Sequence, residues 1–269
     1  MNKLALSLGT LCILGMNVTP VEATVTTVAQ YRLGEADPGA VPGATGANPT
    51  LPSVGAVTLS RQGTPSYSAT LPTGISSGLS MSFNGVNQRY LGPTVSTLAD
   101  NFGVEAWVKS NGSTANLAAL VYNGNSSSSG WGLFRRFGNW TFLYGGVTFG
   151  AGAAPVTTNW THLALVRSGG VASFYVNGQV NDSATVAPNA PAGGFGIGGN
   201  SLAAFDLEYF DGLIDEVRVF TFQPGQFSVT DLNLPPPPQP IPSTDLWAKL
   251  WLTLATLLTA GLALRLRRG

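Results

Sequence analysis

The clearest pattern of apolar and polar positions lies in residues 160–180. Two largely apolar runs, 161–168 and 171–176, are separated by Gly169-Gly170, and Asn177-Gly178 follows directly. Asn-Gly is the dipeptide that most favours the pair of positive φ angles in a type I′ turn. Both runs carry apolar residues on both faces or nearly so, as is typical of strands buried between two packed sheets. The pattern therefore predicts successive antiparallel strands joined by tight turns.

Short apolar runs of the same kind recur through residues 29–232, with turn residues between them. The chain contains 34 glycines and 18 prolines, and only 10% of its residues are charged, a composition that favours strands and turns over long helices. About 210 residues lie between the two unusual ends, which suits one all-β domain. We therefore predict a two-sheet antiparallel sandwich over residues 24–234.

The N-terminal residues 1–23 have the three parts of a secretory signal peptide. Lys3 supplies the positive charge, residues 4–15 form a short apolar run, and small residues flank Glu22 ahead of a cleavage point after Ala23. Cys12, the single cysteine, lies inside the apolar run, so the mature chain is predicted to have none. That excludes a disulfide framework and cysteine-based metal sites. An uncleaved anchor is the alternative.

The C-terminal residues predict a membrane tether. Residues 235–245 form a proline-rich linker, and proline runs are stiff and extended. Residues 246–264 are mostly apolar and just long enough for a transmembrane helix, and the tail 265–269 is basic. Because basic residues stay on the cytoplasmic side, the domain is expected on the far side of the membrane.

Six segments in a fixed order resemble laminin-G-like domains, which are concanavalin A-like jelly rolls. They are an aromatic-x-Leu-x-Glu strand at 31–35, a hairpin at 80–91, a Val-x-Ala-Trp-Val-Lys strand at 104–109, the hairpin at 160–180, a strand at 194–200 and a closing Ile-Asp-Glu-Val-Arg strand at 210–220. A short helical turn is expected at 226–232. The resemblance implies a jelly roll and a binding or adhesion role.

The C-terminal tail resembles a bacterial sorting signal of the Ile-Pro-Thr-Leu type. Its matching residues are Ile241, Pro242 and Trp247, followed after the apolar stretch by Arg265, Arg267 and Arg268. The resemblance implies processing by an exosortase-type transpeptidase, inner-membrane anchoring before sorting, and a final position at the cell surface or in the extracellular matrix. The alternative is a plain anchor that is never cut.

The family resemblance also implies a possible Ca²⁺ ion, since many laminin-G-like domains bind one through oxygen ligands. The candidate ligands are Glu35, Asp211, Asp215 and Glu216. In the alternative interpretation, Asp215 and Glu216 accept hydrogen bonds from turn amides or pair with Arg218.

Catalysis is not expected, and we predict no catalytic residues. His162, the sole histidine, lies within a strand pattern and is predicted to be buried and hydrogen-bonded, not part of a Ser-His-Asp group. Asp206 and Glu208 are two acids on one face of an extended segment, but they lack the surroundings of a glycosidase cleft. A diverged glycoside hydrolase is the weakest alternative.

The predicted role is recognition of extracellular polysaccharide or matrix glycans. Sugars stack on exposed aromatic rings with help from nearby polar groups, and the densest such mixture is Trp131, Arg135, Arg136, Trp140 and Tyr144. The alternative for these rings is that they fill the inner face of the sandwich. Leaving out both ends, eight basic residues stand against eleven acidic ones, so nucleic acid is excluded as a partner. A self-associating structural matrix protein is the second interpretation.

Overall fold

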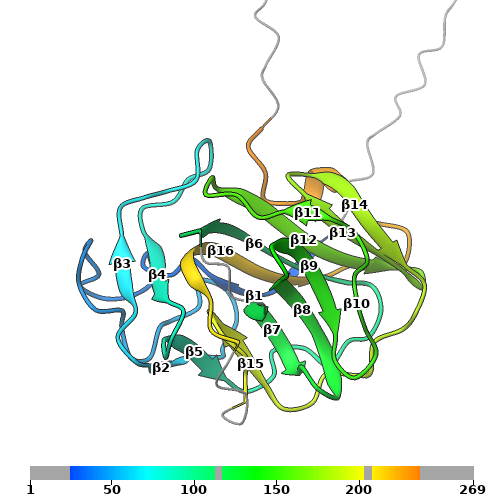
Figure 1. Cartoon of the computed structure of the whole chain (residues 1–269), viewed down its shortest axis with the longest axis horizontal. Coiled ribbons are helices and arrows are strands. Elements are labelled where there is room, and N and C mark those ends of the chain that lie inside the picture. The colour runs from blue at the N-terminus through cyan, green and yellow to red at the C-terminus, as the bar shows by residue number, and fades with distance from the viewer. Residues whose placement is uncertain (1–24, 113–116, 203–207, 237–269) are drawn as a thin grey trace, which may run out of the picture. The chain divides into compact units, whose positions relative to one another are not determined.

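The chain folds as two antiparallel sheets that face each other (Figure 1). The structure is a computed structural model that describes residues 25–112, 117–202 and 208–236. Those residues up to Leu234 belong to one compact unit. This architecture confirms the predicted all-β sandwich. In the described ranges, no helix is long and apolar enough to cross a membrane.

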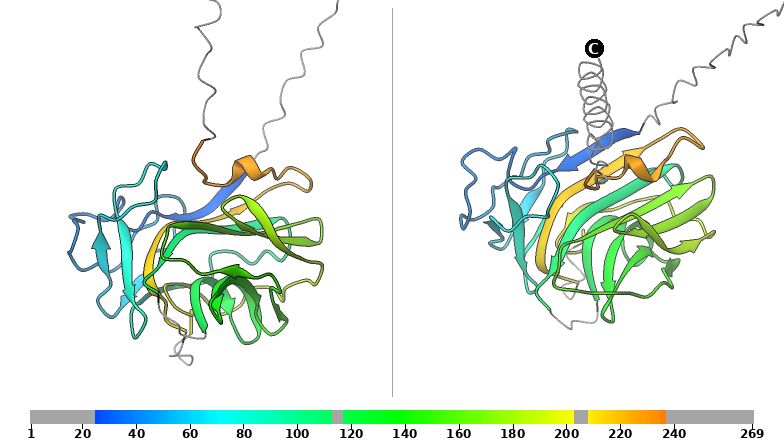
Figure 2. Two further views of the ribbon diagram at one scale, coloured as in Figure 1. Left: turned by 45° about the horizontal axis from the view of Figure 1, so that its top comes forward. Right: turned by 90° about the horizontal axis from the view of Figure 1, so that it is seen from above.

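The first sheet has the strand order β14-β13-β12-β6-β16-β4-β3, and β1 also pairs with β16. The closing strand β16 is long enough to pair with β4 through its first half and with β1 through its second half. Figure 2 shows β1 in blue beside it. The strands are β1 (Thr26–Tyr31), β3 (Ser66–Ser68), β4 (Ser80–Asn84), β6 (Phe102–Ser110), β12 (Thr161–Ser168), β13 (Val171–Val176), β14 (Gln179–Ala184) and β16 (Asp211–Thr221).

The second sheet has the order β10-β9-β8-β7-β15-β5-β2, and β11 pairs with β9. A hairpin in this sheet is formed by β8 and β9, which are joined by a two-residue turn. The strands are β2 (Ser60–Gln62), β5 (Arg89–Gly92), β7 (Leu117–Asn125), β8 (Ser129–Arg136), β9 (Asn139–Tyr144), β10 (Thr148–Phe149), β11 (Ala154–Pro155) and β15 (Gly194–Ile197).

The apolar side chains at every second position of the strands fill the space between the sheets. Val104, Ala106 and Val108 of β6 contribute to one large core cluster, as do Trp140 and Phe142 of β9. Alternate residues of a strand point to opposite faces, so each strand needs only every second residue to be apolar for this core. Burial of these side chains supplies most of the driving force for folding.

The hairpin predicted at residues 80–91 is wrong. The two strands form where expected, but β4 pairs within the first sheet and β5 within the second. The connection around Gly85 therefore crosses between the sheets. An apolar alternation fixes which residues face the core, but it does not say which neighbour a strand pairs with.

The hairpin at residues 160–180 forms as predicted. β12 and β13 pair in full register, and Asn177-Gly178 joins β13 to β14 with φ angles of 50° and 78°. The predicted helical turn near the C-terminus is a short 3₁₀ helix, η1 (Val229–Asp231). It opens the C-terminal strap, defined here as residues 228–234.

The C-terminal strap covers part of the outer face of the first sheet. Leu232 is buried in a second apolar cluster with Ala164, Val166, Phe220 and Phe222. Figure 2 shows the orange C-terminal segment alongside this sheet. Because an outer face covered in this way is no longer in water, polar groups beneath the strap must find partners within the protein.

His162 is one of those groups, and it is buried and hydrogen-bonded as predicted. Its ring lies against Trp107 with a centroid distance of 5.3 Å, and its Nε2 is 2.9 Å from Oε2 of Glu105. The side chains of Glu105 and Trp107 project from the outer face, since Val104, Ala106 and Val108 beside them point into the core between the sheets. His162 therefore contacts, on that outer face, the two residues that hydrogen-bond to Asn233 of the strap.

Candidate functional site

A bulge in β16 creates the most organised polar site among the described residues. The pairing of β16 with β6 shifts register between Asp215 and Arg218, and Glu216 adopts a positive φ of 49°. The bulge falls where β16 changes its other neighbour from β4 to β1. A bulge locally re-aims side chains, and here it places two adjacent carboxyl groups at the junction of the three strands.

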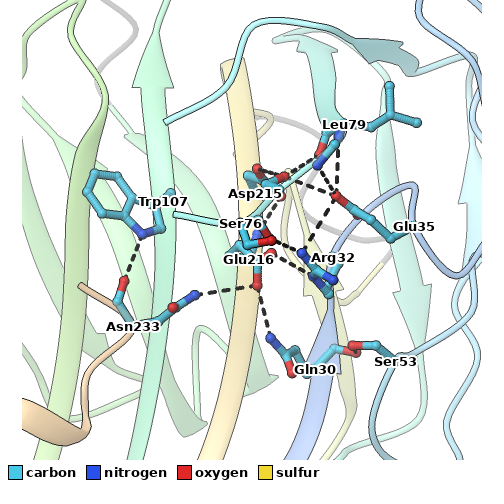
Figure 3. Close-up of polar contacts among 12 residues, drawn as sticks. Gln30, Arg32, Glu35, Ser53, Ser76, Leu79, Trp107, Asp215, Glu216 and Asn233 are labelled. Carbon is cyan, nitrogen blue, oxygen red and sulfur yellow. Dashed lines mark hydrogen bonds and ion pairs between the residues drawn. The ribbon is translucent and has the colours of Figure 1, made fainter. Parts of the chain in front are cut away.

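The Glu216 carboxylate is buried and accepts hydrogen bonds from three side chains (Figure 3). Arg32 Nε donates to its Oε1 at 2.7 Å, while Gln30 Nε2 and Asn233 Nδ2 donate to its Oε2 at 2.9 and 3.4 Å. These donors come from β1, from the residue after it, and from the C-terminal strap. One anion therefore fixes three flexible side chains from distant parts of the sequence.

Asp215 lies beside Glu216 but has a different environment. Its side chain is fully buried, and it accepts hydrogen bonds from Ser77 Oγ at 2.7 Å and from the backbone N–H of Glu216 at 2.7 Å. Burial, together with the nearby carboxylates of Glu216 and Glu35, raises the pKa of Asp215 to about 8 despite these two hydrogen bonds. Asp215 is therefore largely protonated at neutral pH.

A pocket of about 400 Å³ opens next to Glu216, and we call it the β16 pocket. Its lining residues are Gln30, Arg32, Ser53, Ile75, Ser76, Glu216 and Asn233. Gln30 and Asn233 each turn their NH₂ group to the carboxylate, so their amide oxygens remain as acceptors. Arg32 is 28% exposed and adds charged donors. The pocket thus presents both donors and acceptors in fixed positions.

The four predicted calcium ligands are not gathered at one point. Glu35, Asp215 and Glu216 lie in the bulge region, where Ser77 Oγ is 3.1 Å from a Glu35 carboxyl oxygen and 2.7 Å from an Asp215 carboxyl oxygen. Asp211 lies at the start of β16, opposite Asn84, and accepts a hydrogen bond from Asn111. Across the described residues, no group of three or more His, Cys, Asp or Glu side chains is arranged to hold a metal ion. The calcium site stays a prediction, to be tested by melting with and without a chelator.

Most of the aromatic and arginine residues predicted to bind ligand lie in the interior. Trp131, Arg135, Trp140 and Tyr144 are each at most 1% exposed, whereas Arg136 is exposed at the end of β8. The three buried rings belong to the core between the sheets, the alternative that the sequence left open. Their faces contact other side chains, so only Arg136 of this group is accessible to a ligand.

The residues that line the β16 pocket were not recognisable from sequence patterns. Arg32 lies within the strand motif that ends at Glu35, and Asn233 directly precedes Leu234 and the proline run. Neither has a neighbour in the sequence that suggests a site, because their common partner Glu216 is far away along the chain. The sorting residues Ile241, Pro242, Trp247, Arg265, Arg267 and Arg268 lie outside the described residues, as does the signal peptide.

A second pocket of about 430 Å³ lies at one edge of the sandwich, and we call it the edge pocket. It is lined by Thr148, Phe149, Gly150 and Ala151 around β10, by Val171, and by residues 182–186 at the end of β14 and beyond. Asp182 contributes a carboxylate, which accepts a hydrogen bond from the backbone N–H of Ala151 at 2.7 Å. Phe149 adds a half-buried aromatic ring.

Comparison with known proteins identifies relatives of the fold. Residues 84–224 match the family described as the concanavalin A-like lectin/glucanases superfamily. No curated protein sequence matches the chain.

Three solved structures illustrate the likeness. Domain 4 of a GH43 extracellular arabinanase from Geobacillus stearothermophilus, in complex with arabinotriose, has a TM-score of 0.55 and 22% identity, covering 77% of this chain and 98% of that chain. The binding domain of botulinum neurotoxin DC, in complex with SialylT, has a TM-score of 0.55 and 11% identity, covering 77% and 50%. The botulinum neurotoxin serotype C1 binding domain has a TM-score of 0.55 and 10% identity, covering 77% and 51%. This chain spans about half the length of the two toxin structures, and the likeness at these identities concerns the fold alone.

Proposed function

Because the chain belongs to the concanavalin A-like lectin/glucanases superfamily, we propose that it is a glycan-binding module whose β16 pocket holds a sugar unit. The single observation that carries the proposal is the Glu216 carboxylate, which fixes Gln30, Arg32 and Asn233 around that pocket. Two structural neighbours, the arabinanase domain and a toxin binding domain, were solved with arabinotriose and with SialylT, which supports a carbohydrate ligand.

The chemistry of the pocket suits sugar hydroxyl groups. Each hydroxyl both donates and accepts a hydrogen bond, and the pocket offers amide oxygens as acceptors next to guanidinium donors. Since these groups are held in place before a ligand arrives, little side-chain entropy is lost on binding. Ile75 adds an apolar contact for a sugar ring face. A pocket of about 400 Å³ has room for one or two sugar units.

The proposed role is binding without hydrolysis. Glycoside hydrolysis uses two carboxyl groups on either side of the scissile bond. Glu216 is the one carboxylate among the residues that line the β16 pocket, and its two oxygens already accept three hydrogen bonds. Asp215 is buried behind it and is not part of the lining. Because three side chains already donate to it, the Glu216 carboxylate favours a positioning role over acid or base catalysis.

The proposed place of action is outside the inner membrane. The signal-like residues 1–23, the apolar stretch 246–264 and the sorting-type residues support export, anchoring in the membrane, and processing by an exosortase-type enzyme. The partner would then be an extracellular polysaccharide or matrix glycan. A chain presented at the cell envelope meets such polymers directly.

A glycan array with the full chain, solubilised in mild detergent, tests the proposal. Ser76 is exposed and lines the β16 pocket, so Ser76→Trp should fill the pocket and abolish binding without disturbing Glu216. Ser128→Trp is the matched control, because Ser128 is exposed in the turn between β7 and β8 and lines neither pocket. Binding lost in the first variant and retained in the second is the expected result.

Two results would contradict the proposal. One is equal sugar binding by the two tryptophan variants, which would move the site elsewhere. The other is an absence of binding to every glycan together with concentration-dependent assembly in sedimentation experiments. That second result would favour the self-associating matrix protein.

A further inference from the structure

The turn between β8 and β9 contains Phe137, a bulky residue in a left-handed backbone conformation with its side chain outside the core. Phe137 and Gly138 form this two-residue turn with φ angles of 47° and 75°. The turn between β13 and β14 has nearly the same pair, 50° and 78°, at Asn177-Gly178. Asn tolerates the left-handed region in the first position of such a turn, whereas a bulky aromatic residue there is an outlier.

A phenylalanine at position 137 is also unusual because its side chain is exposed to solvent. The Phe137 side chain is 65% exposed, so burial does not offset the backbone strain. Large apolar side chains on a surface are otherwise a common mark of interaction sites. Strained residues that persist without a packing reason are concentrated at functional sites. The turn therefore points to a ligand and not to a folding requirement.

Arg136 completes an ordered array with two aromatic rings. Its guanidinium carbon lies 5.0 Å from the centroid of Phe137 and 4.4 Å from that of Phe149. Phe149 in turn contacts the buried ring of Phe134 edge-on at 5.8 Å, which anchors the array to the second sheet. Arg136 is exposed at the end of β8, and among the described residues its guanidinium has no hydrogen bond or ion pair.

The array adjoins the edge pocket, because Phe149 contributes to both. The pocket adds the hydroxyl groups of Thr148, Ser183 and Thr185 and the carboxylate of Asp182. A flat bilayer would have to remove water from that carboxylate at a high cost in free energy, whereas sugar hydroxyls can donate to it. The surroundings therefore favour a sugar chain over a membrane surface.

We propose that Phe137, Arg136 and Phe149 bind an acidic sugar unit, with the next unit of the polysaccharide in the edge pocket. The sugar ring would stack on an aromatic face, and Arg136 would pair with the carboxylate in the bidentate geometry that a guanidinium offers. This inference rests on the proposed glycan-binding function, but it concerns a separate surface and a specific class of ligand.

Calorimetry with polygalacturonate and its methyl ester tests the inference on the full chain in mild detergent. The acid form is expected to bind, and its neutral ester to bind about tenfold more weakly, because the ester lacks the charge that pairs with Arg136. Arg136→Gln should lower the affinity for the acid form about tenfold, and added salt should weaken binding of the wild-type chain.

Phe137→Asn is the decisive variant. It copies the Asn177-Gly178 turn found elsewhere in this chain, so the backbone strain disappears and the melting temperature should rise. Binding to polygalacturonate should nevertheless fall about tenfold, since the stacking ring is gone. Lost affinity combined with higher stability does not arise from misfolding. Val86→Asn, which changes another exposed apolar residue (67%), is the control and should retain full binding.

Three results would overturn the inference. They are unchanged binding in Phe137→Asn, equal affinity for the acid and its ester, or tighter binding to phosphatidylglycerol vesicles than to polygalacturonate. The Ser76→Trp variant separates this site from the β16 pocket, since it should leave the binding of polygalacturonate at the array intact. The outcome for Phe137 therefore stands whether or not the β16 pocket binds sugar.

Discussion

Asp215 and Glu216 are neighbours in sequence, yet the fold gives their carboxyl groups opposite tasks. Glu216 accepts from Arg32 and two amides, which compensates its charge in a buried position. Asp215 has no cationic side chain among its hydrogen-bond donors, and burial raises its pKa to about 8. Two adjacent acids are tolerated in this bulge because one of them is largely neutral at physiological pH.

This difference predicts a pH dependence of stability. The Asp215 carboxyl ionises near 3.8 in the unfolded chain and near 8 in the folded one, so the folded state binds the proton more tightly between those values. Its contribution to stability is thus fully present below pH 4 and falls by up to about 1.4 kcal/mol per pH unit as pH rises to 8. Asp215→Asn, which cannot ionise, should remove that part of the slope.

Urea denaturation at pH 5, 7 and 9 measures the effect. The difference in unfolding free energy between the Asn variant and the wild-type chain should grow in favour of the variant as pH increases. Parallel pH profiles for the two chains would show that Asp215 is ionised in the folded protein. Titrating groups far from Asp215 cancel in this comparison because both chains share them, whereas Glu216 and Glu35 interact with Asp215 and contribute to the measured difference.

The conformation of a residue could be predicted from the sequence where it depends on the neighbouring residues. The contacts of a side chain could not be predicted where its partner lies far away along the chain. The positive φ angles at Asn177-Gly178 follow from the dipeptide itself. Alternation placed Trp140 and Tyr144 on one face of a strand, but it did not tell an inner face from an outer one. Arg32 and Asn233 meet only at Glu216, and no pattern within their own segments contains that information.

At the scale of elements, the C-terminal strap joins two polar clusters. The backbone N–H of Asn233 donates to Glu105 at 3.0 Å, and its carbonyl accepts from Trp107 Nε1 at 3.0 Å. Its side chain reaches Glu216 in the β16 pocket. Glu105 itself also pairs with His162 and Arg218. The strap is therefore held by a buried carboxylate on one side and supplies a wall of the pocket on the other.

Glu105→Gln should release the strap. Although burial alone would raise the pKa of Glu105, its hydrogen bond with His162 and the nearby charge of Arg218 bring that pKa below its usual value. Removing the charge leaves Arg218 without its ion pair beneath the strap, which should cost about 3–5 kcal/mol of unfolding free energy. Amide hydrogen exchange at residues 231–234 should speed up as well.

Asp100→Asn provides the comparison for that variant. Asp100 lies 3.7 Å from Arg167, and its side chain is 42% exposed although that of Arg167 is only 6% exposed. Because water reaches this carboxylate but not that of Glu105, removing the charge of Asp100 should cost less unfolding free energy than removing that of Glu105. A Glu105 variant no less stable than this control would show that the buried network does not hold the strap. Unchanged exchange at residues 231–234 would lead to the same conclusion.

Strand positions were easier to predict from the sequence than strand partners. The strands β6, β12 and β13 lie where their apolar patterns placed them, whereas the first strand, expected at 31–35, is β1 and ends at Tyr31. The pairing of β4 and β5 with different sheets, and the bulge at Asp215-Glu216, were not predictable from those patterns. Both depend on β16 being shared by β1, β4 and β6, which is a property of the assembled sheet.

For the molecule as a whole, the limits of the folded unit restrict where the chain can be processed. β1 begins at Thr26, and Val25 already packs against the outer apolar cluster beside the strap. At the other end, Leu234 packs against the same cluster, and the proline run starts one residue later. Processing that preserves the sandwich must therefore cut before Val25 and after Leu234.

The expected cleavage after Ala23 leaves one residue, Thr24, ahead of Val25, so mass spectrometry of the exported protein should give a mature chain that begins at Thr24. Removal of even a few more residues would cost the pairing of β1 with β16, including the buried Ala29 and Tyr31 further along that strand. A mature N-terminus beyond Val25 would contradict the signal-peptide prediction. In a host with an exosortase, a second cut near Ile241-Pro242 should leave the strap and the β16 pocket complete, so the released form should bind glycans as well as the anchored form does.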